Sequence, residues 1–563
     1  MSWKNRFQDH LEQIAFFLEY HGSNPFKIRA FSNALEILGA MDEHTLRKEI
    51  ESGLLIERKG IGKGILQVAR DFLKTETSHE LKSAAGETPL ALFQLRQVKG
   101  LGVKKIKTLY EGLQITSLGE LEYACAENRL VSLPGFGQKT QEKIVHELNQ
   151  LKARASLLLL SDGLYQSEEV LKVLKPLKWP VNPIGDVARR SEVVSSIEFL
   201  AEAKDPKYVF DKLSEVRSIT DLSLDKSEAK IQFKIKGISD VSLYCRSQES
   251  FNSFEIFKTS SAQHWKALQT LAEKKNYHLT PQGLLKNSKP VDPLASIYSS
   301  LDLPIYPPES RELPPEAKSK WKPLSTQQIQ GAFHLHTQYS DGLNTLQEMA
   351  AEARRLGWKY FGVSEHSQTA SYANGLKEEN LQKQWKEIDA LNDENSDSFF
   401  IFKGIESDIL KDGHLDYPKT LLKHFDFVIA SIHTRYGMTE MTSRLIKAIE
   451  DPFTTMIGHI SGRLLLARDA YAFDKKKVVD AAIANRVAIE FNSNPHRLDL
   501  EWQDLAEACQ RGLLVSLNPD AHSIEGLSDI CYGMWFANKA RIPHELILNT
   551  WSAEQLQSFF AES

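Results

Sequence analysis

The pattern of apolar and polar positions changes twice along the 563-residue chain. Up to about residue 155 it favours short helices separated by Gly-x-Gly turns. Residues 156–300 mix helical segments with short alternating runs such as KIQFKIKGI and DVSLYC, which are typical of strands. After residue 330, apolar runs alternate regularly with amphipathic helical segments. The chain is therefore expected to be multidomain and to combine α+β with α/β architecture.

The regular alternation in the C-terminal part predicts a parallel arrangement of strands. The apolar runs are AFHLHT, YFGVSEH, FFIFKGIES, DFVIASIHT, TMIGHIS, VAIEFNSN and LLVSLNPDAH. Helical segments such as TLQEMAAEARRLG and KKVVDAAIANR lie between them. Seven strands with intervening helices are most economically arranged as a closed β/α barrel.

A proline-rich stretch from Leu301 to Ser325 marks the clearest domain boundary. It contains six prolines, too many for a regular helix or a central strand, which predicts a semi-extended linker. We therefore expect five segments, with boundaries at 1–85, 86–155, 156–300, 301–330 and 331–563. The first two are helical, the third is mixed, the fourth is the linker and the last is the barrel.

The composition is that of a folded protein, with 42% apolar and 25% charged residues. The chain has 69 basic and 74 acidic side chains, so its total charge does not indicate a strongly basic nucleic-acid binder. No apolar run approaches the roughly 18 to 20 residues that cross a bilayer. The charged N-terminus does not resemble a secretory signal, and the four cysteines lie far apart. We expect a cytoplasmic monomer with reduced thiols and no membrane partner.

Residues able to bind metals recur where the predicted barrel strands end. They are His334, His336, Asp341, His366, Glu406, His433, His459, Asp520 and His522. In His334-x-His336 and Asp520-x-His522, the two-residue period of a strand places both side chains on one face. Because barrel active sites form where the carboxyl ends of the strands converge, these residues are expected to form one site.

The residue types indicate the chemistry of that site. Imidazole and carboxylate ligands suit Zn, Mn or Fe, whereas a thiolate site is excluded because no cysteine takes part. Nine ligands are too many for one tetrahedral ion, so two or three divalent metal ions are expected. Clustered metals suit phosphate-ester hydrolysis, because one can activate water while others stabilise the leaving oxygen. The alternative is that these are ordinary strand-end histidines satisfied by hydrogen bonds.

The same segments resemble a known family. FHLHTQYSDG, VSEHS, GIESDIL, DFVIASIHT, MIGHISGRLL, IEFNSNPHRLDL and NPDAHS together are similar to a PHP (polymerase and histidinol phosphatase) domain from residue 331 to about 560. The resemblance implies a distorted seven-stranded β/α barrel with a multinuclear site, Mn first and Zn or Fe as alternatives. Glu406 would bridge metals and His433 would join it in the catalytic centre. Glu365 stands where the family usually has Asp, and little consequence is expected.

Two arginines near this site are candidates for holding substrate phosphates. Arg463 and Arg497 occur in the segments SGR and PHR. The planar guanidinium presents a fork of donors that matches phosphate oxygens. The alternative is that both are ordinary structural or surface arginines.

Three N-terminal segments, RKGIGKGI, VKGLGVKKI and LPGFGQKTQEKI, resemble helix-hairpin-helix motifs. Their glycines would let backbone N–H groups at a helix N-terminus approach a DNA phosphate, with lysines beside them. The predicted DNA-binding residues are Gly60, Gly62, Lys63, Gly100, Gly102, Lys104, Lys105, Gly135, Gly137 and Lys139. Such contacts read no base sequence, so the expected partner is DNA at ends or gaps. The alternative is that the turns only connect packed helices.

The segment NPFKIRAFSNALEILG, followed by a Gly-x-Gly hairpin, resembles the small N-terminal domain of family X DNA polymerases. In members with lyase activity, a lysine beyond that hairpin forms a Schiff base with an abasic sugar. The corresponding position holds Val68, which has no amine. Lyase chemistry is therefore not expected.

Residues 156–300 resemble the palm and thumb of the same polymerases, but the catalytic positions differ. In GDVARRSEVVSSIEFL, Asp186 replaces a phosphate-binding serine, and Ser196 and Glu198 occupy the two D-x-D positions. Ser242 stands at the third carboxylate position. Because a hydroxyl is a weak, neutral Mg ligand, this polymerase core is expected to be inactive. The alternative is a misaligned, divergent palm.

Taken with the motifs, the sequence predicts a bacterial-type family X polymerase homologue whose PHP domain is a metal-dependent phosphoesterase. The expected reaction is 3′-to-5′ exonucleolysis or the processing of 3′ ends in DNA repair. Three alternatives remain. They are an active polymerase with an exonuclease, a non-catalytic DNA-binding scaffold, and a small-molecule phosphatase resembling histidinol phosphatase, against which the hairpins argue.

Overall fold

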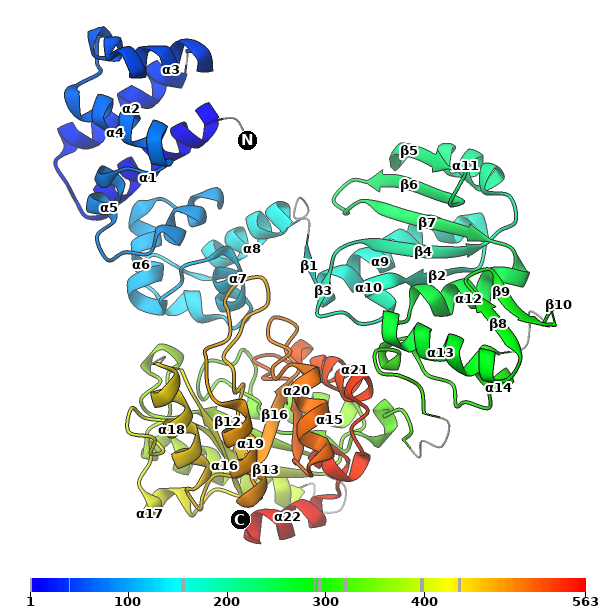
Figure 1. Cartoon of the computed structure of the whole chain (residues 1–563). Helices are drawn as coiled ribbons and strands as arrows, with labels where there is room; N and C mark the ends of the chain where they lie inside the picture. Colours follow the sequence, from blue (N-terminus) through cyan, green and yellow to red (C-terminus); the bar gives the residue numbers. More distant parts are fainter. Residues whose placement is uncertain are drawn as a thin grey trace. The chain divides into compact units, whose positions relative to one another are not determined.

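The computed structural model describes residues 3–39, 41–152, 157–287, 289–291, 296–316, 321–394, 399–433 and 437–562. The chain divides into two compact units, Met1–Leu148 and Asn149–Ser563 (Figure 1). The boundary lies a few residues before the one predicted near residue 155. The predicted proline-rich boundary lies within the second unit.

The N-terminal unit is helical, as predicted. Its helices are α1 (Trp3–Tyr20), α2 (Pro25–Gly39), α3 (Glu43–Ser52), α4 (Lys63–Thr75), α5 (His79–Ala85), α6 (Val103–Leu113), α7 (Leu118–Ala126) and the start of α8 (Gln138–Lys152). Each Gly-x-Gly turn leads directly into a helix: α4, α6 or α8. The first glycine of each turn has a φ of 98°, 89° or 82°, a conformation that a side chain would strain. This is why the three turns share their glycines.

The next part of the chain is built on a mixed sheet. Its elements are β1 (Leu158–Leu159), α9 (Leu160–Leu174), β2 (Val181–Ile184), α10 (Gly185–Ala188), β3 (Val193–Val194), β4 (Ile197–Glu202), α11 (Pro206–Ser214), β5 (Ile219–Asp225), β6 (Lys230–Ile235) and β7 (Val241–Arg246). The five-stranded sheet has the order β2-β4-β7-β6-β5. Strands β4 and β7 are parallel, and their register pairs Glu198 with Ser242.

A smaller subdomain follows, with α12 (Gln248–Lys258), α13 (Ala262–Lys274), β8 (Tyr277–Thr280), β9 (Gly283–Lys286), β10 (Lys289–Pro290) and α14 (Ile297–Ser300). The proline-rich segment then packs against it. As predicted, the described parts of this segment, 301–316 and 321–330, contain only short 3₁₀ turns. However, Leu303 and Tyr306 are buried in the core of the subdomain, and Arg311 and Glu312 are also buried. The segment is therefore a packed connection, and the expectation of a free semi-extended linker is wrong for these residues.

The C-terminal barrel contains the seven predicted strands: β11 (Gly331–Ala332), β12 (Tyr360–His366), β13 (Phe400–Asp408), β14 (Phe427–Ser431), β15 (Met456–Ile457), β16 (Ala488–Asn492) and β17 (Val515–Asn518). They are parallel and pair in chain order. The ring closes beyond β11, where Leu335 bridges Ala521 and the His336 N–H donates to the Ala521 carbonyl at 2.9 Å. Strands β11 and β15 have only two residues each, which makes the β/α barrel irregular.

Helices surround the strands of the barrel (Figure 1). They are α15 (Leu346–Arg355), α16 (Glu378–Glu394), α17 (Lys419–Leu422), α18 (Met438–Ile449), α19 (Lys475–Ala484), α20 (Trp502–Gln510), α21 (Ile530–Ala540) and α22 (Ala553–Glu562). Helix α15 begins with a capping box between Thr345 and Glu348, which satisfies two otherwise free N–H groups at its first turn.

The two ends of the barrel interior differ in polarity. At the amino ends of the strands, the rings of Phe333, Phe402 and Phe427 surround Phe560 of α22, with centroids 5.5–5.7 Å from it. A Cβ on Gly404 would lie only 2.1 Å from the Phe427 ring, so the absence of a side chain there makes room for this cluster. Aromatic side chains fill this end, whereas the buried histidines lie at the opposite, carboxyl end.

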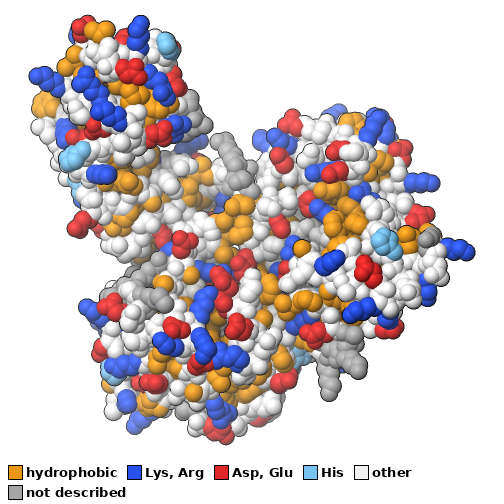
Figure 2. All heavy atoms as spheres, in the orientation of Figure 1, with side chains coloured by type: hydrophobic (Ala, Val, Ile, Leu, Met, Phe, Trp, Pro, Cys, Tyr) orange, Lys and Arg blue, Asp and Glu red, His pale blue; other side chains and the backbone are white. Residues whose placement is uncertain are grey.

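The surface carries charges of both signs. On the face shown in Figure 2, Lys and Arg side chains are interspersed with Asp and Glu, in keeping with the formal net charge of −5. Among the described residues, no helix combines the length and apolar character needed to cross a bilayer.

Candidate functional site

The structure brings the nine predicted metal ligands together at the carboxyl end of the barrel. His366 ends β12, Glu406 lies in β13 as its register partner, and the others follow the ends of β11, β14, β15 and β17. Their side chains are at most 13% exposed. Strands that are far apart along the chain thus place imidazoles and carboxylates close together in space.

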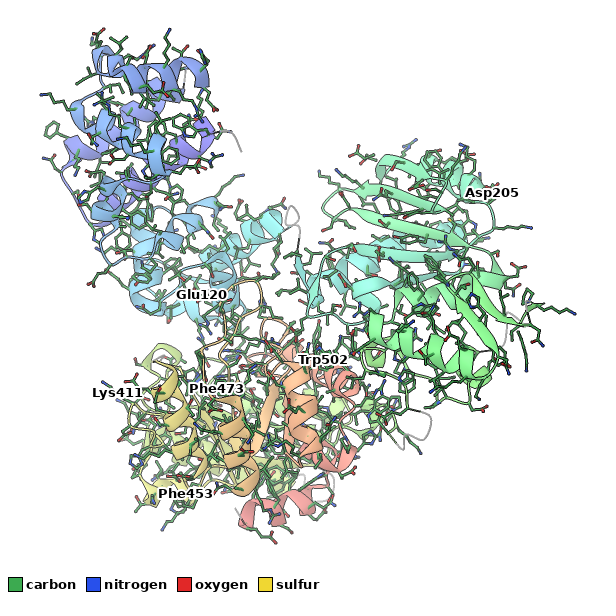
Figure 3. The ribbon with its side chains drawn as sticks, in the orientation of Figure 1. Glu120, Asp205, Lys411, Phe453, Phe473 and Trp502 are labelled. Atoms are coloured by element: carbon green, nitrogen blue, oxygen red, sulfur yellow. The ribbon has the colours of Figure 1, made fainter. Side chains whose placement is uncertain are left out.

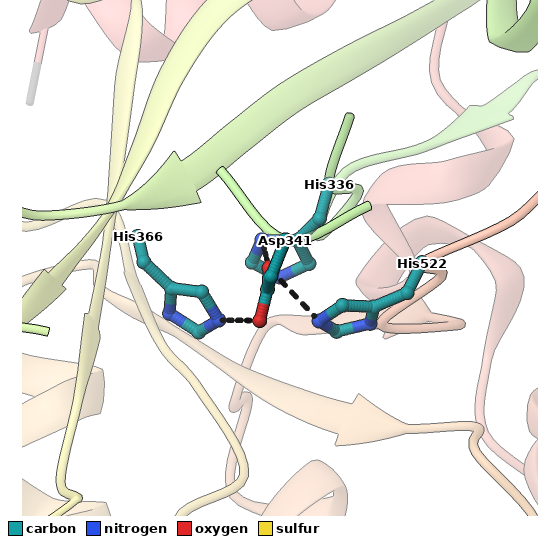
Figure 4. A group of neighbouring side chains, drawn as sticks. All are labelled: His336, Asp341, His366 and His522. Carbon is teal, nitrogen blue, oxygen red and sulfur yellow. Dashed lines mark ion pairs between the residues drawn. The ribbon is translucent and has the colours of Figure 1, made fainter. Parts of the chain in front are cut away.

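One group of these ligands consists of His336, Asp341, His366 and His522 (Figure 4). The two Asp341 carboxylate oxygens lie 3.4 Å from His522 Nε2 and 3.5 Å from His366 Nε2. The His336 ring lies between the other two imidazoles, with centroids 4.4 Å from His366 and 4.2 Å from His522. One potential ligand atom from each of the four residues lies within 4.8 Å of the others.

Glu406 lies between this group and the remaining histidines. Its Oε1 is 2.9 Å from His459 Nε2, 3.3 Å from His334 Nε2 and 3.4 Å from His433 Nε2. Its Oε2 is 2.7 Å from His366 Nδ1. The two oxygens of one carboxylate therefore face different sets of imidazoles.

Several of these buried polar atoms lie near other polar atoms but make no hydrogen bond of good geometry. They include His334 Nε2, both ring nitrogens of His336, Asp341 Oδ2 and Glu406 Oε2. Each such atom costs about 1 to 3 kcal/mol when buried unpaired, so a concentration of them at one point needs a stabilising ligand. The donor set fits Zn, Mn or Fe. The alternative of histidines that are satisfied by hydrogen bonds is not supported by this arrangement.

The charges at the site depend on one another. Burial alone would lower the pKa of His334, but the carboxylates of Asp520, Glu490 and Glu406 outweigh it and raise that pKa well above its usual value. Burial and the neighbouring His522 and His366 instead lower the pKa of His336 to about 3. His336 is therefore a neutral imidazole, the form that binds a metal.

Two carboxylates behind the predicted ligands, the buried Glu490 and the partly exposed Asp408, were not recognised in the sequence. Glu490 Oε2 lies 2.5 Å from His334 Nδ1, and Asp408 Oδ1 lies 2.5 Å from His433 Nδ1. Such partners fix the orientation and tautomer of a ligating histidine. The available signals were a glutamate within the apolar run VAIEFNSN and an aspartate two residues after Glu406, on the same strand face.

Glu365 has a larger structural role than expected from the sequence. It is fully buried, and its carboxylate accepts hydrogen bonds from Thr337 Oγ1 at 2.5 Å, from Gln384 Nε2 at 2.9 Å and from the Ser340 hydroxyl. Burial raises its pKa to about 7. These bonds hold the loop between His336 and Asp341, so Glu365 supports a predicted metal ligand.

The two candidate arginines are in different situations. Arg463 is 7% exposed, and its guanidinium donates to the Arg497 carbonyl at 3.0 Å, to the Leu498 carbonyl and to Glu192 at 2.9 Å. Because these bonds engage its donors, the geometry favours the structural alternative for Arg463. Arg497, in contrast, lies at the metal site, with Nε 3.7 Å from the ligand Asp520.

The predicted DNA-binding turns leave helix N-termini open. Gly62 and Gly102 are the N-caps of α4 and α6, neither helix has a side-chain cap, and a Cβ on either glycine would meet nothing within 4 Å. Of the lysines beside the turns, Lys63, Lys104 and Lys139 are exposed and Lys105 is half-buried. Gly60, Gly100 and Gly135 adopt the positive φ of each turn. Val68, at the lyase position, is buried.

The altered polymerase positions form internal contacts. Glu198 forms an ion pair with Lys258 at 3.0 Å and accepts a hydrogen bond from the Tyr244 hydroxyl at 3.3 Å. It is the register partner of Ser242 on the neighbouring strand. Asp186 accepts hydrogen bonds from the N–H and hydroxyl of Ser195, at 3.0 and 2.6 Å. Ser196 immediately precedes β4, and is partly exposed.

Four family models match the chain. They are the PHP domain at residues 332–494, a helix-hairpin-helix domain at 2–78, a SAM-like helix-hairpin-helix tandem at 92–150 and the DNA polymerase beta thumb at 256–312. The matches follow the order of the predicted regions.

Curated proteins match either the whole chain or the barrel alone. A protein of Bacillus subtilis named DNA polymerase/3′-5′ exonuclease PolX is 31% identical over 562 residues, which cover 98% of both chains. Probable phosphatases of Caldicellulosiruptor saccharolyticus and Caldicellulosiruptor bescii are 29% and 28% identical over 38% and 40% of this chain, and over 90% and 92% of their own lengths.

Proposed function

Because this chain belongs to the bacterial PolX family, the family X DNA polymerases with a C-terminal PHP domain, we propose that its barrel is a phosphoesterase acting on 3′ ends of DNA. The reaction would be 3′-to-5′ exonucleolysis or removal of 3′-blocking groups during DNA repair. The observation that carries this proposal is the convergence of nine imidazole and carboxylate side chains, none more than 13% exposed, on one end of the barrel.

The site would hold two or three divalent ions, with Mn preferred and Zn or Fe as alternatives. The group around Asp341 would hold one ion, and Glu406, whose oxygens face two sets of imidazoles, would be shared between ions. When bound, such ions supply Lewis-acid activation of water and neutralise phosphodiester charge.

The residues of the chain would orient the substrate and keep the ligands in place. Glu490 and Asp408 hold His334 and His433 so that the opposite ring nitrogens point into the site. Arg497 supplies positive charge beside Asp520, where a scissile phosphate would approach. Arg463 would support this loop through its bonds to the backbone.

The hairpin turns would bring DNA to the enzyme. Uncapped helix N-termini bind phosphate through backbone N–H groups and the helix dipole, and exposed lysines add charge. Neither type of contact reads base edges, which supports binding that is independent of sequence.

We propose that the polymerase core is inactive. Of the three metal-binding carboxylate positions, only Glu198 remains acidic, and its charge is already paired with Lys258. Ser242, beside it, offers a neutral hydroxyl. Two Mg ions and a triphosphate carry charges that this arrangement does not balance.

The experiment that tests the proposal measures degradation of 3′-end-labelled DNA with Mn, Zn or Mg, using the wild type and His334→Ala. We expect metal-dependent release of label by the wild type and a loss of at least about 100-fold in the variant, since a direct metal ligand is removed. Equal rates for the two proteins would disprove the assignment of the metal site. DNA binding without any hydrolysis would instead favour a scaffold.

A second candidate is a small-molecule phosphatase, because relatives that match only the barrel are named probable phosphatases. Comparing kcat/KM for an oligonucleotide with that for p-nitrophenyl phosphate separates the two candidates. A clear preference for the monoester would favour this second function.

A further inference from the structure

Within the C-terminal unit, the segment that corresponds to the polymerase phosphate-binding motif contacts the connection and the barrel. We call residues 185–192 the latch segment. The Arg189 guanidinium forms a bidentate ion pair with Glu312, with Nε 3.0 Å from Oε1 and Nη2 2.7 Å from Oε2. Lys539 of α21 donates to the Arg189 carbonyl at 2.9 Å and lies 3.5 Å from the same Glu312 carboxylate.

Glu312 and Lys539 are shielded from water, whereas the Arg189 side chain is 26% exposed. Lys539 is 2% exposed, and its ammonium lies 5.9 Å from the centre of the Trp502 ring, labelled in Figure 3. The next residue of the latch segment, Arg190, places its guanidinium 4.2 Å from the centre of the Trp535 ring on α21. Charge-assisted bonds of this kind are strong because little solvent competes with them.

The end of the latch segment reaches towards the metal centre. Glu192 accepts a hydrogen bond from Arg463 at 2.9 Å. Arg463 follows the ligand His459 by four residues, and it also holds the backbone carbonyls of Arg497 and Leu498. Arg497 in turn lies 3.7 Å from the ligand Asp520. A single buried guanidinium therefore connects Glu192 with two loops of the site.

The charge of Arg463 requires such a partner. A buried guanidinium without a counter-charge is unfavourable, and backbone carbonyls supply only partial charges. Two other carboxylates interact with it: Glu501, 3.5 Å away and 48% exposed, and the fully buried Asp499, whose pKa the positive charge of Arg463 lowers against the effect of burial. The same two loops are joined at Asp499, whose carboxylate accepts from the N–H groups of Ser461 and Gly462. Of the two carboxylates that form an ion pair with Arg463, Glu192 is therefore the closer and the less exposed.

We propose that the latch segment has exchanged nucleotide binding for a docking role, in which Glu192 is a positioning residue that orders the Arg463 and Arg497 loops of the phosphoesterase site. The effect on catalysis rests on the proposed function, whereas the ordering of the loops does not. The degenerate palm would then be retained because the nuclease centre depends on it.

The test compares the full-length wild type with Glu192→Gln and Glu192→Asp. The matched control is Glu215→Gln, which removes the same charge from an exposed palm residue that pairs with Lys212. Steady-state rates are measured on a 5′-labelled single-stranded oligonucleotide as a function of Mn concentration, and backbone hydrogen exchange is followed at residues 461–463 and 497–499. Thermal unfolding checks that each variant is folded.

We expect Glu192→Gln to lower kcat about tenfold, because small displacements of a positioning loop strongly affect reaction rates. KM and the half-saturating Mn concentration should stay within about threefold of the wild type if the effect is on positioning. Glu192→Asp should recover most of kcat, and Glu215→Gln should behave as the wild type. Exchange in both loops should accelerate in Glu192→Gln alone.

Three results would overturn the proposal: unchanged kcat in Glu192→Gln, unchanged exchange in the loops, or a loss of activity explained entirely by a higher Mn requirement. If the wild type has no phosphoesterase activity, the proposed function fails, but hydrogen exchange still decides whether Glu192 orders the loops.

Discussion

Replacing Glu490 by Gln tests whether the carboxylates behind the metal ligands determine metal affinity. Each Glu490 oxygen accepts from two donors. Oε2 faces His334 Nδ1 at 2.5 Å and the Asn518 amide at 3.0 Å, and Oε1 faces the His459 N–H and the Asn492 amide, both at 2.9 Å. The opposite nitrogen of His334 lies 3.3 Å from Glu406.

A glutamine has nearly the same shape but only one acceptor oxygen. In either orientation its NH₂ group faces two donors, so two hydrogen bonds are lost and the negative charge disappears. Losses of this kind amount to about 2 to 3 kcal/mol, which corresponds to about 30- to 150-fold in an equilibrium constant. That range agrees with the usual effect of altering a residue that supports a metal ligand, about 10- to 100-fold.

The measurement is a Mn titration of DNA hydrolysis, supported by the metal content of protein purified with Mn. We expect the half-saturating Mn concentration of Glu490→Gln to rise about 10- to 100-fold, with kcat at saturating Mn within about threefold of the wild type. Glu507→Gln removes an exposed carboxylate from α20 and serves as the control. An unchanged Mn requirement in Glu490→Gln would refute the reasoning.

Three further predictions concern the other regions. Primer extension with Mg or Mn should be absent, and templated extension that is lost in Ser196→Ala plus Glu198→Ala would contradict an inactive palm. Lys104→Ala should weaken DNA binding equally for all sequences and reduce the salt slope by about one, provided that it contacts a phosphate. Burial lowers the pKa of His264 to about 4, so the unfolded state takes up a proton that the folded state does not between pH 6.5 and 4. Urea unfolding should show that, between pH 7 and 4.5, the free energy of unfolding of the wild type falls by about 2 to 3 kcal/mol more than that of His264→Gln.

The sequence by itself determined the barrel and indicated which side chains converge at one end of it. Strand candidates alternated with helices over more than 200 residues, and local periodicity places His334 with His336 and Asp520 with His522 on shared faces. Because parallel strands of a barrel end at the same side, strand-end positions alone indicated which residues converge. The Gly-x-Gly turns could also be predicted from the sequence, because the positive φ that they need is a local requirement that glycine meets.

Only the tertiary structure decided which groups support the site. Glu490 and His334 are 156 residues apart, and Glu192 and Arg463 are 271 residues apart, so no local pattern pairs them. The same holds for the proline-rich connection, whose composition excludes helix and strand but does not reveal that Tyr306 and Glu312 are buried. Periodicity and turn chemistry act over a few residues, whereas the partner of a buried charge is chosen by the folding of the whole unit.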